Sequence, residues 1–313
     1  MSRHIHIPLL ADITLVDDHK TIAADEDDPR LDRNYEKLGP LGNRILAARL
    51  MRVFVIKGVH FPTMRGRRDA ERQANQTALS ERLGNAAAPT VELIEAIEPL
   101  VAYVRGDAPE DMVGPALQTL IGRLFKPDFA SSPRLWLAAT RFDGAARSQN
   151  PLRWLWSALA GTLNADRKVL AESVGGDPIA VHGIAIAIHN IVKSLALMRT
   201  AYADPVRRST LGDKAAAMAC LVAPDSVLRQ AKVVAEIPGA SLKPGSLVVY
   251  QLGTAARRSF DPKVAFQSNS WSFCPAADFV FKLLALIWAQ AIQAPNEHEP
   301  AETPEVQASE GGT

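Results

Sequence analysis

Cys274 has the surroundings in this chain that most favour chemistry. It lies in the segment Ser-Trp-Ser-Phe-Cys-Pro-Ala-Ala of residues 270–277, directly ahead of the strongly apolar stretch 278–292. Such a stretch predicts a buried helix, and a sulphur just ahead of its first turn meets the helix dipole and unpaired backbone N–H groups. These lower the pKa of the thiol and favour a thiolate, which is a good metal ligand. The alternative is that Cys274 is a small buried apolar residue, as most free cysteines are.

Two further groups of side chains are candidates for binding or catalysis. Residues 60–68, His-Phe-Pro-Thr-Met-Arg-Gly-Arg-Arg, form the most basic cluster of the chain and include His60 and Arg65. This cluster is either a solvated face or a site for an anionic group such as a phosphate or a carboxylate. His189 lies in a very apolar predicted helix, 179–202, beside a stripe of large apolar residues at spacings of three and four. It is either a satisfied core residue or a ligand.

Helical patterns dominate the segments that must position these residues. Apolar residues recur at helical spacing over 43–56, 71–83, 90–105, 115–124, 179–202, 213–222 and 278–292. Strand signals are confined to 9–16 and to the late segments 233–237, 242 and 247–252. Residues 25–30, which are mostly acidic, read as a loop. The sequence therefore predicts a mainly α fold with a small late β-sheet, in which Trp136, Trp154 and Trp156 belong to the core.

Composition and charge exclude several classes of protein. The chain has 313 residues, 47% hydrophobic and 22% charged, with a net charge of +1, which indicates a globular protein that does not bind nucleic acid. Its two cysteines form neither a disulfide framework nor a four-ligand zinc site, so a reducing cytoplasm is expected. The first fifteen residues include His4, His6 and Asp12 and lack the apolar core of a signal peptide.

The domain organisation expected from the sequence is simple. No run of eighteen uncharged apolar residues occurs, so no membrane segment is predicted. Residues 1–293 form a single domain. Residues 294–313 are rich in Pro, Glu, Ala, Ser and Gly, and are expected to be a disordered tail.

From residue 223 onward the chain resembles the C-terminal half of a cytochrome P450. The family has a turn after its Glu-x-x-Arg helix, a basic residue that binds a haem propionate, a Gly-rich hairpin, an Arg-Asp-Pro segment, the loop with the thiolate ligand, and a last long helix. The corresponding pieces occur here in the same order: Ala223-Pro224, Val227-Leu228-Arg229, Gly239 to Gly245, Ala256-Arg257-Arg258, Asp261-Pro262 and Phe273-Cys274-Pro275.

The earlier chain resembles the same family in a fainter way. Asp28-Pro29-Arg30-Leu31 is similar to a segment before the haem-covering loop, and residues 60–68 are similar to the helix whose His and Arg reach the propionates. Residues 179–205 take the place of the long distal helix. The resemblance implies a reduced cytochrome P450-like fold.

Four departures limit what the resemblance implies. The distal Ala-Gly-x-Glu/Asp-Thr motif falls on residues 185–189, which begin with Ala185 and place Ile188 and His189 where the acid and the alcohol stand. The Glu-x-x-Arg motif falls on residues 217–220, Ala-Met-Ala-Cys, so its salt bridge is absent. The basic residue two before the cysteine is Ser272, and the chain is shorter than ordinary members.

The resemblance implies haem b as cofactor, with Cys274 as the iron ligand and Arg229, His60, Arg65, Phe273 and Ala185 around the haem. His189 would be the catalytic acid and base toward a bound peroxide, or would ligate the iron. The implied function is a haem-thiolate oxidoreductase that uses dioxygen or peroxide on a small, largely apolar molecule, with a ferredoxin-type electron donor or a second protein subunit as partner. The alternatives are a haem-thiolate isomerase, dehydratase or lyase, and a non-catalytic haem or scaffold protein that works as a partner subunit, with an exposed apolar patch where elements are missing.

Overall fold

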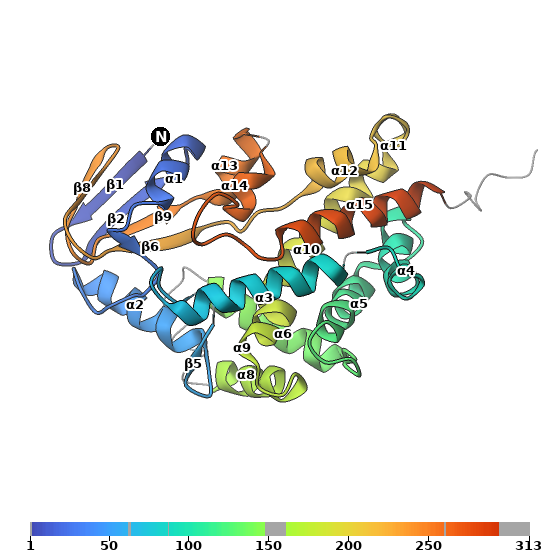
Figure 1. The fold of residues 1–313 in the computed structure, drawn as a ribbon, viewed down its shortest axis with the longest axis horizontal. Coiled ribbons are helices and arrows are strands. Elements are labelled where there is room, and N and C mark those ends of the chain that lie inside the picture. Colours follow the sequence, from blue (N-terminus) through green and yellow to red (C-terminus); the bar gives the residue numbers. More distant parts are fainter. Residues whose placement is uncertain (1, 62–63, 87, 148–160, 260, 294–313) are drawn as a thin grey trace, which may run out of the picture.

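The computed structural model describes residues 2–293 apart from 62–63, 87, 148–160 and 260. Trp154, Trp156 and the predicted tail 294–313 lie outside the described residues. In the described part the chain is mainly helical and carries one five-stranded sheet and two small two-stranded sheets. In Figure 1 the strands β1, β2 and β8 lie at one end of the molecule, the helices α4, α5, α11 and α12 lie toward the other, and β5 lies low between them beside α8 and α9.

The five-stranded sheet joins both ends of the sequence. Its strands are β1 (Ser2–Ile7), β2 (Ala11–Val16), β9 (Leu247–Tyr250), β6 (Val227–Ala231) and β3 (Leu31–Asp32), in that spatial order. Neighbours pair antiparallel except β2 and β9, which are parallel. The sheet is therefore not confined to the late part of the chain, because three of its strands lie within the first 32 residues. The sequence patterns missed β1, β3 and β6.

The alternation of side chains gives the sheet two buried faces. Ile13, Leu228 and Leu247 point into the large helical core. Val16, Leu31 and Tyr250 point the other way, into a smaller core that Ile22 of α1 (His19–Glu26) covers. Because successive strand residues point to opposite faces, β2, β6 and β9 each contribute to both cores.

The helix α2 and two short hairpins complete the part of the molecule that carries the strands. The helix α2 (Leu41–Val53) leads into the hairpin of β4 (Val55–Ile56) and β5 (Val59–His60). The hairpin of β7 (Ala235–Ile237) and β8 (Ala240–Leu242) extends from β6. The turn between β1 and β2 and the start of α2 expose large apolar side chains, namely Ile7, Leu9, Leu10, Leu41 and Ile45. An exposed apolar patch was predicted for a shortened chain.

The remaining helices follow the predicted order. Those before the middle of the chain are α3 (Ala70–Ala86), α4 (Val91–Arg105), α5 (Glu110–Arg123), α6 (Pro133–Arg147) and α8 (Thr162–Ser173). Those after it are α11 (Pro205–Thr210), α12 (Asp213–Cys220), α13 (Leu252–Ser259), α14 (Pro262–Phe266) and α15 (Ala277–Gln293). Bounds were predicted for α3, α4, α5, α12 and α15, and they agree with the structure to within three residues, except that α5 begins five residues before the predicted 115. No bounds were predicted for α6, α8, α11, α13 and α14.

A long central rod connects the two groups of helices. It consists of α9 (Pro178–His182), a π-helical turn (Gly183–Ala187) and α10 (Ile188–Ala203). Asp177 caps its start by accepting a hydrogen bond from the backbone N–H of Ile179 at 2.8 Å. The predicted stripe of Ile184, Ile188, Ile191, Leu195 and Met198 is buried, and at most 5% of any of these residues is exposed.

The π turn leaves carbonyl groups that side chains from neighbouring helices satisfy. Gln118 of α5 donates its Nε2 to the carbonyl oxygen of Ile184 at 3.0 Å, and Arg147 of α6 donates Nη2 to that of Ile186 at 3.2 Å. A π turn inside an α-helix often marks a functional position, and here it spans Ala185.

The rod Pro178–Ala203 is long and apolar enough to cross a membrane by length and composition, although no membrane segment was predicted. It packs against α4, α5, α6, α12 and α15, as the core helix of a folded domain does.

Candidate functional site

Cys274 lies in the loop between α14 and α15, three residues before α15 begins. Its backbone N–H donates to the carbonyl oxygen of Phe266 at 2.8 Å, and its own carbonyl oxygen accepts from Ala277 at 3.2 Å. The residue is half-buried. Burial raises the pKa of its thiol, against the opposing effects of a hydrogen bond from the backbone N–H of Ala276 and the charge of Arg33. The lowered pKa predicted for Cys274 is therefore wrong for the protein without a metal, because desolvation outweighs the single amide and the distant charge.

Phe273 attaches the cysteine loop to α3. Its carbonyl oxygen accepts a hydrogen bond of 2.7 Å from Nε2 of Gln76, a buried residue in the middle of α3. The backbone N–H of Phe273 donates to Ser270 at 3.1 Å. Phe273 thus fixes the position of the loop through its backbone.

Arg229 of β6 is 1% exposed and forms the centre of a buried polar network, which we call the Arg229 cluster: Glu26, Arg33, Arg72, Arg229, Gln267, Trp271 and Ser272. Its Nη2 forms an ion pair with Glu26 at the end of α1 and donates to Oγ of Ser272 at 2.7 Å. Ser272 also donates to Oε2 of Glu26 at 2.7 Å, and Nε2 of Gln267 donates to Oε1 of Glu26 at 2.7 Å. Arg229 is thereby linked directly to the cysteine loop.

Three guanidinium groups surround the ring of Trp271. The guanidinium carbon lies 4.7 Å from the ring centroid for Arg72, 5.5 Å for Arg229 and 6.0 Å for Arg33. All three arginines are buried. Because Trp271 lies three residues before Cys274, these positive charges converge beside the thiol-bearing loop.

The charges in the Arg229 cluster shift the pKa values of its members. Desolvation acts to raise the pKa of Glu26, but Arg229, Arg33 and Ser272 outweigh it and hold that pKa below its usual value. Burial, together with the charges of Arg229 and Arg72, lowers the pKa of Arg33. The neighbouring Asp25 behaves in the opposite way, since burial and repulsion by Asp28 and Glu26 raise its pKa to about 6.

Several N–H donors of this cluster have no acceptor. Among the described residues, Nε of Arg33, Nε of Arg229 and Nε1 of Trp271 are buried atoms without a hydrogen-bond partner. Glu26 is the carboxylate that bonds to Arg229, and it does not use these three N–H groups. They can therefore donate hydrogen bonds to further carboxylate groups.

Of this cluster, Arg229 could be predicted from the sequence, whereas Glu26, Arg33, Arg72 and Gln267 could not. Residues 25–30 read as a loop because they are acidic, and nothing local indicates that Glu26 is 3% exposed. Arg72 was overlooked because its predicted helix is rich in polar residues. Its position in the first turn of that helix, directly after the basic cluster 60–68, could have indicated it.

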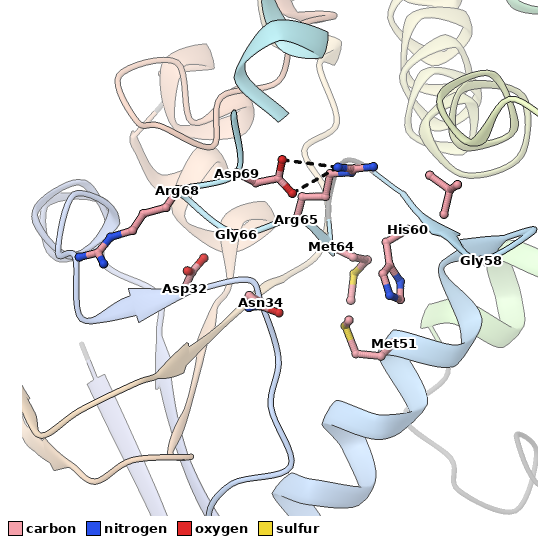
Figure 2. Close-up of a pocket in the computed structure, with 11 residues that line it drawn as sticks. Asp32, Asn34, Met51, Gly58, His60, Met64, Arg65, Gly66, Arg68 and Asp69 are labelled. Atoms are coloured by element: carbon pink, nitrogen blue, oxygen red, sulfur yellow. Dashed lines mark hydrogen bonds and ion pairs between the residues drawn. The ribbon is translucent and has the colours of Figure 1, made fainter. Parts of the chain in front are cut away.

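His60 and Arg65 line a separate pocket of about 470 Å³ (Figure 2). Arg65 pairs with Asp69 at 3.2 Å and with Glu71, while Nδ1 of His60 is buried without a partner in the described chain. No hydrogen bond or ion pair joins either residue to Arg229 within the described residues. Met64 lies in a 3₁₀ turn and residues 65–69 are not helical, so the described part of 60–68 does not form the α-helix that the family resemblance predicted, and α3 begins only at Ala70. Gly66 lies against Asp32.

A smaller pocket of about 210 Å³ shares His60 and Arg65 with the first and is bounded by Glu71 and Asp177. Neither pocket is lined by Cys274, Phe273 or Ala185. Figure 2 shows the larger one between the strand of Asp32, the helix of Met51 and the turn of Arg65.

His189 lies against α6. Its ring stacks on Trp136 with a centroid distance of 5.0 Å, and it forms a hydrogen bond to the backbone of Ala139. Burial lowers its pKa, and its Nε2 has no partner among the described residues. Ala185 is fully buried in the π turn.

His182 is a second histidine of the rod that the sequence analysis did not select. Its ring meets Phe61 edge-on at 5.7 Å, and its Nδ1 is a buried atom without a described partner. Burial, with smaller effects of Arg147 and Arg33, lowers its pKa to about 4.

Comparisons with known proteins identify the fold. No family model and no curated protein matches the chain. Solved structures match it over most of its length. The cytochrome P450 CxnD, which forms a C–S bond in chuangxinmycin biosynthesis, has a TM-score of 0.58 and 15% identity over 92% of this chain and 82% of its own. CYP175A1 of Thermus thermophilus has a TM-score of 0.55 and 13% identity, and the match covers 92% of this chain and 83% of that protein. Cytochrome P450EX alpha, solved with myristic acid, has a TM-score of 0.53 and 12% identity, and the match covers 89% of this chain and 80% of that protein.

Proposed function

From the premise that this chain has the cytochrome P450 fold, we propose that it is a haem-thiolate oxidoreductase with Cys274 as the iron ligand. The observation that carries the proposal is the convergence of buried arginines with unpartnered donors beside the loop that presents Cys274. Haem, when bound to a cysteine thiolate, supplies an iron centre that supports oxidation chemistry.

The donor set beside Cys274 fits the polar edge of a haem. Haem carries two carboxylates, and a carboxylate suits the planar fork of a guanidinium. Arg33 and Arg229 each keep one buried N–H without an acceptor, and Trp271 keeps its indole N–H. We assign Arg229 and Arg33 to the propionates. His60 and Arg65 were predicted to bind the propionates. They line the neighbouring pocket, and we do not assign them to the propionates.

Other residues of the chain position the thiol. Gln76 holds the cysteine loop on α3 through the carbonyl of Phe273. The backbone N–H of Ala276 stabilises negative charge on Cys274.

On the rod, Ala185 is a small side chain in the π turn, and both His182 and His189 are neutral at neutral pH because their pKa values are lowered. A neutral imidazole can hold or accept a proton, which is the acid–base role proposed for His189 and now also for His182.

The substrate proposed is a small, largely apolar molecule, with dioxygen or peroxide as the oxidant. The related structure that holds myristic acid supports an apolar ligand. A ferredoxin-type electron donor or a second subunit as partner and a cytoplasmic location stay predictions.

The test is the absorption spectrum of the purified protein, ferric and then dithionite-reduced under carbon monoxide. We expect the reduced protein with carbon monoxide to show the long-wavelength Soret band that marks thiolate ligation, and Cys274→Ala to lose it. Cys220→Ala is the matched control, because Cys220 is buried on α12 and burial raises its pKa to about 11. Absence of a Soret band after haem is supplied would contradict the proposal.

A second candidate, a haem-free scaffold that works as a partner subunit, is favoured by one observation. Glu26 and Ser272 already bind the guanidinium of Arg229 from within the protein, so this arginine does not depend on an outside carboxylate. The same spectrum decides between the two functions. A folded protein that takes up no haem, in both the wild type and Cys274→Ala, is the result expected of the scaffold.

A further inference from the structure

Three metal-ligating side chains meet on the hairpin of β1 and β2, at the edge of the five-stranded sheet. His4 and His6 are two apart on β1 and therefore point to the same face, and Asp12 of β2 stands directly opposite His6 in the register. Their ligand atoms all lie within 4.8 Å of one another, and the two imidazole rings stack with an interplanar angle of 10°. The function proposed above does not use any of these residues.

Asp12 is held rigidly and is only half satisfied. It is 5% exposed, and its Oδ2 accepts a hydrogen bond of 2.5 Å from Oγ of Ser246. Asn43 fixes its backbone on both sides, accepting from the N–H at 3.3 Å and donating to the carbonyl at 2.8 Å. The other oxygen, Oδ1, is buried, has no hydrogen-bond donor and lies 3.5 Å from Nε2 of His4.

His4 presents its second ring nitrogen to that oxygen. Its Nδ1 lies 2.9 Å from Oγ1 of the buried Thr14. With Nδ1 bonded to Thr14, Nε2 is the ring nitrogen that faces Oδ1 of Asp12, so the two atoms can ligate one metal ion from neighbouring positions. A hydrogen bond to one nitrogen of a histidine is the usual device that orients the other nitrogen toward a metal.

We propose that His4, His6 and Asp12 bind a divalent transition-metal ion, with Zn²⁺ as the natural occupant. Two imidazoles and one carboxylate are ligands that zinc accepts at about 2.0–2.2 Å, so donor atoms of a tetrahedral site lie about 3.3 Å apart. The 3.5 Å between His4 and Asp12 matches this spacing. His6 is exposed, and rotation of its ring brings the third donor in.

The ion connects the edge strand to the sheet. β1 pairs only with β2 within the described chain, and its outer side is open. A metal clip between His4, His6 and Asp12 holds the two strands in register, and Thr14 and Ser246 orient the ligands from behind. Three protein ligands leave the fourth position to water.

Zinc binding by the full-length chain tests the proposal. After treatment with a chelator and its removal, equilibrium dialysis against Zn²⁺ is expected to give one bound ion per chain, and Co²⁺ to give the visible bands of a tetrahedral site. The variant His6→Gln is expected to bind at least tenfold more weakly, as is Asp12→Asn. His19→Gln removes a histidine from α1 that is not a ligand, and is expected to bind as the wild type does.

The variants have an independent check on folding. His6 is exposed, so His6→Gln without metal should keep the circular dichroism and the unfolding temperature of the wild type. Zinc binding that is equal in the wild type and His6→Gln would overturn the proposal. So would the absence of stoichiometric zinc and cobalt binding by the wild type, which would leave a plain His4–Asp12 ion pair. Neither result depends on whether the chain binds haem.

Discussion

Two polar clusters lie on the same face of the five-stranded sheet. His4, Thr14, Val248 and Arg229 are paired one after another across four neighbouring strands, so His4 and Arg229 stand at opposite ends of one row. At the inner end, Arg229 is 1% exposed, and three arginines converge on one tryptophan with Glu26 as their buried carboxylate neighbour. At the outer edge, His4, His6 and Asp12 bring three potential metal ligands together. The Arg229 cluster thus has more positive than negative side chains, whereas the group of His4, His6 and Asp12 consists of side chains that can bind a metal ion.

The difference follows from depth in the protein. An ion buried away from water must find its partners within the fold, and Arg229 finds Glu26, Ser272 and the carbonyl of Leu228. At the edge, water and ions reach the side chains, so His6 stays exposed. The buried Arg229 cluster therefore contributes to the stability of the fold through its own ion pair, whereas the group of His4, His6 and Asp12 can gain stability by binding an ion.

The largest effect is expected from breaking the inner pair. Glu26→Gln leaves the guanidinium of Arg229 buried without its counter-charge, and we expect a loss of about 3–5 kcal/mol in the free energy of unfolding. Urea unfolding monitored by tryptophan fluorescence measures it. The control is Glu36→Gln, which removes a bridge of 2.8 Å to Lys232 that is half exposed, with an expected loss of about 0.5 kcal/mol. Equal losses in the two variants would show that the inner pair is worth no more than a surface bridge.

The pH dependence of stability is expected to report the same pair. The pKa of Glu26 is lower in the folded protein than in the unfolded chain, so the unfolded state binds the proton more readily. The stabilisation by Glu26 is therefore present above its unfolded pKa and is lost as the pH falls through the folded pKa. We expect the stability difference between wild type and Glu26→Gln to be largest above about pH 5 and to shrink below about pH 4. A constant difference over this range would contradict the assignment.

At the outer edge, zinc is expected to stabilise the chain. An ion that binds only the folded state adds about 2.7 kcal/mol at a free concentration one hundred times its dissociation constant. Thermal unfolding with and without Zn²⁺ measures the shift. We expect His6→Gln to lose it and His19→Gln to keep it, and a shift of equal size in both variants would assign the zinc to another site.

A smaller effect is expected from Asp25, next to Glu26. Its pKa is raised to about 6, so at neutral pH the ionised carboxylate opposes folding. Asp25→Asn removes this cost, and we expect a gain of about 1 kcal/mol at pH 8, allowing for partial solvation. The gain should disappear below about pH 4, where the carboxyl is protonated in both states. Urea unfolding at the two pH values tests this, and a loss of stability at pH 8 would show that the charge of Asp25 is needed.

The smallest effect is expected at the contact between α3 and the cysteine loop. Gln76→Ala removes the hydrogen bond of 2.7 Å to Phe273, and we expect a loss of about 1 kcal/mol with faster hydrogen exchange in residues 267–276. Gln73→Ala is the control, because Gln73 is exposed on the same helix about one turn earlier. Unchanged exchange in Gln76→Ala would mean that other contacts hold the loop.

Two residues of the candidate site, Cys274 and Arg229, could be selected from the sequence because their local surroundings are distinctive. Cys274 stands ahead of a long apolar helix, and the order of the pieces around Arg229 resembles the cytochrome P450 series. The partners of these residues could not be predicted. Glu26 and Arg229 are 203 residues apart in the chain, and only the fold brings them together.

The sequence by itself determined the longer apolar helices such as α4 and α15, because the 3.6-residue repeat of apolar side chains is a local property. It did not indicate α1, whose last two residues belong to a segment that was predicted to be a loop. It also determined the place of Cys274 and of the rod with its buried stripe. The tertiary structure alone decided the pairing of β1, β3 and β6 into the sheet, the burial of Glu26, the raised pKa of Cys274 and the register that puts Asp12 opposite His6. The physical reason is that strand pairing, desolvation and charge pairing depend on what packs against a residue, which distant parts of the chain supply.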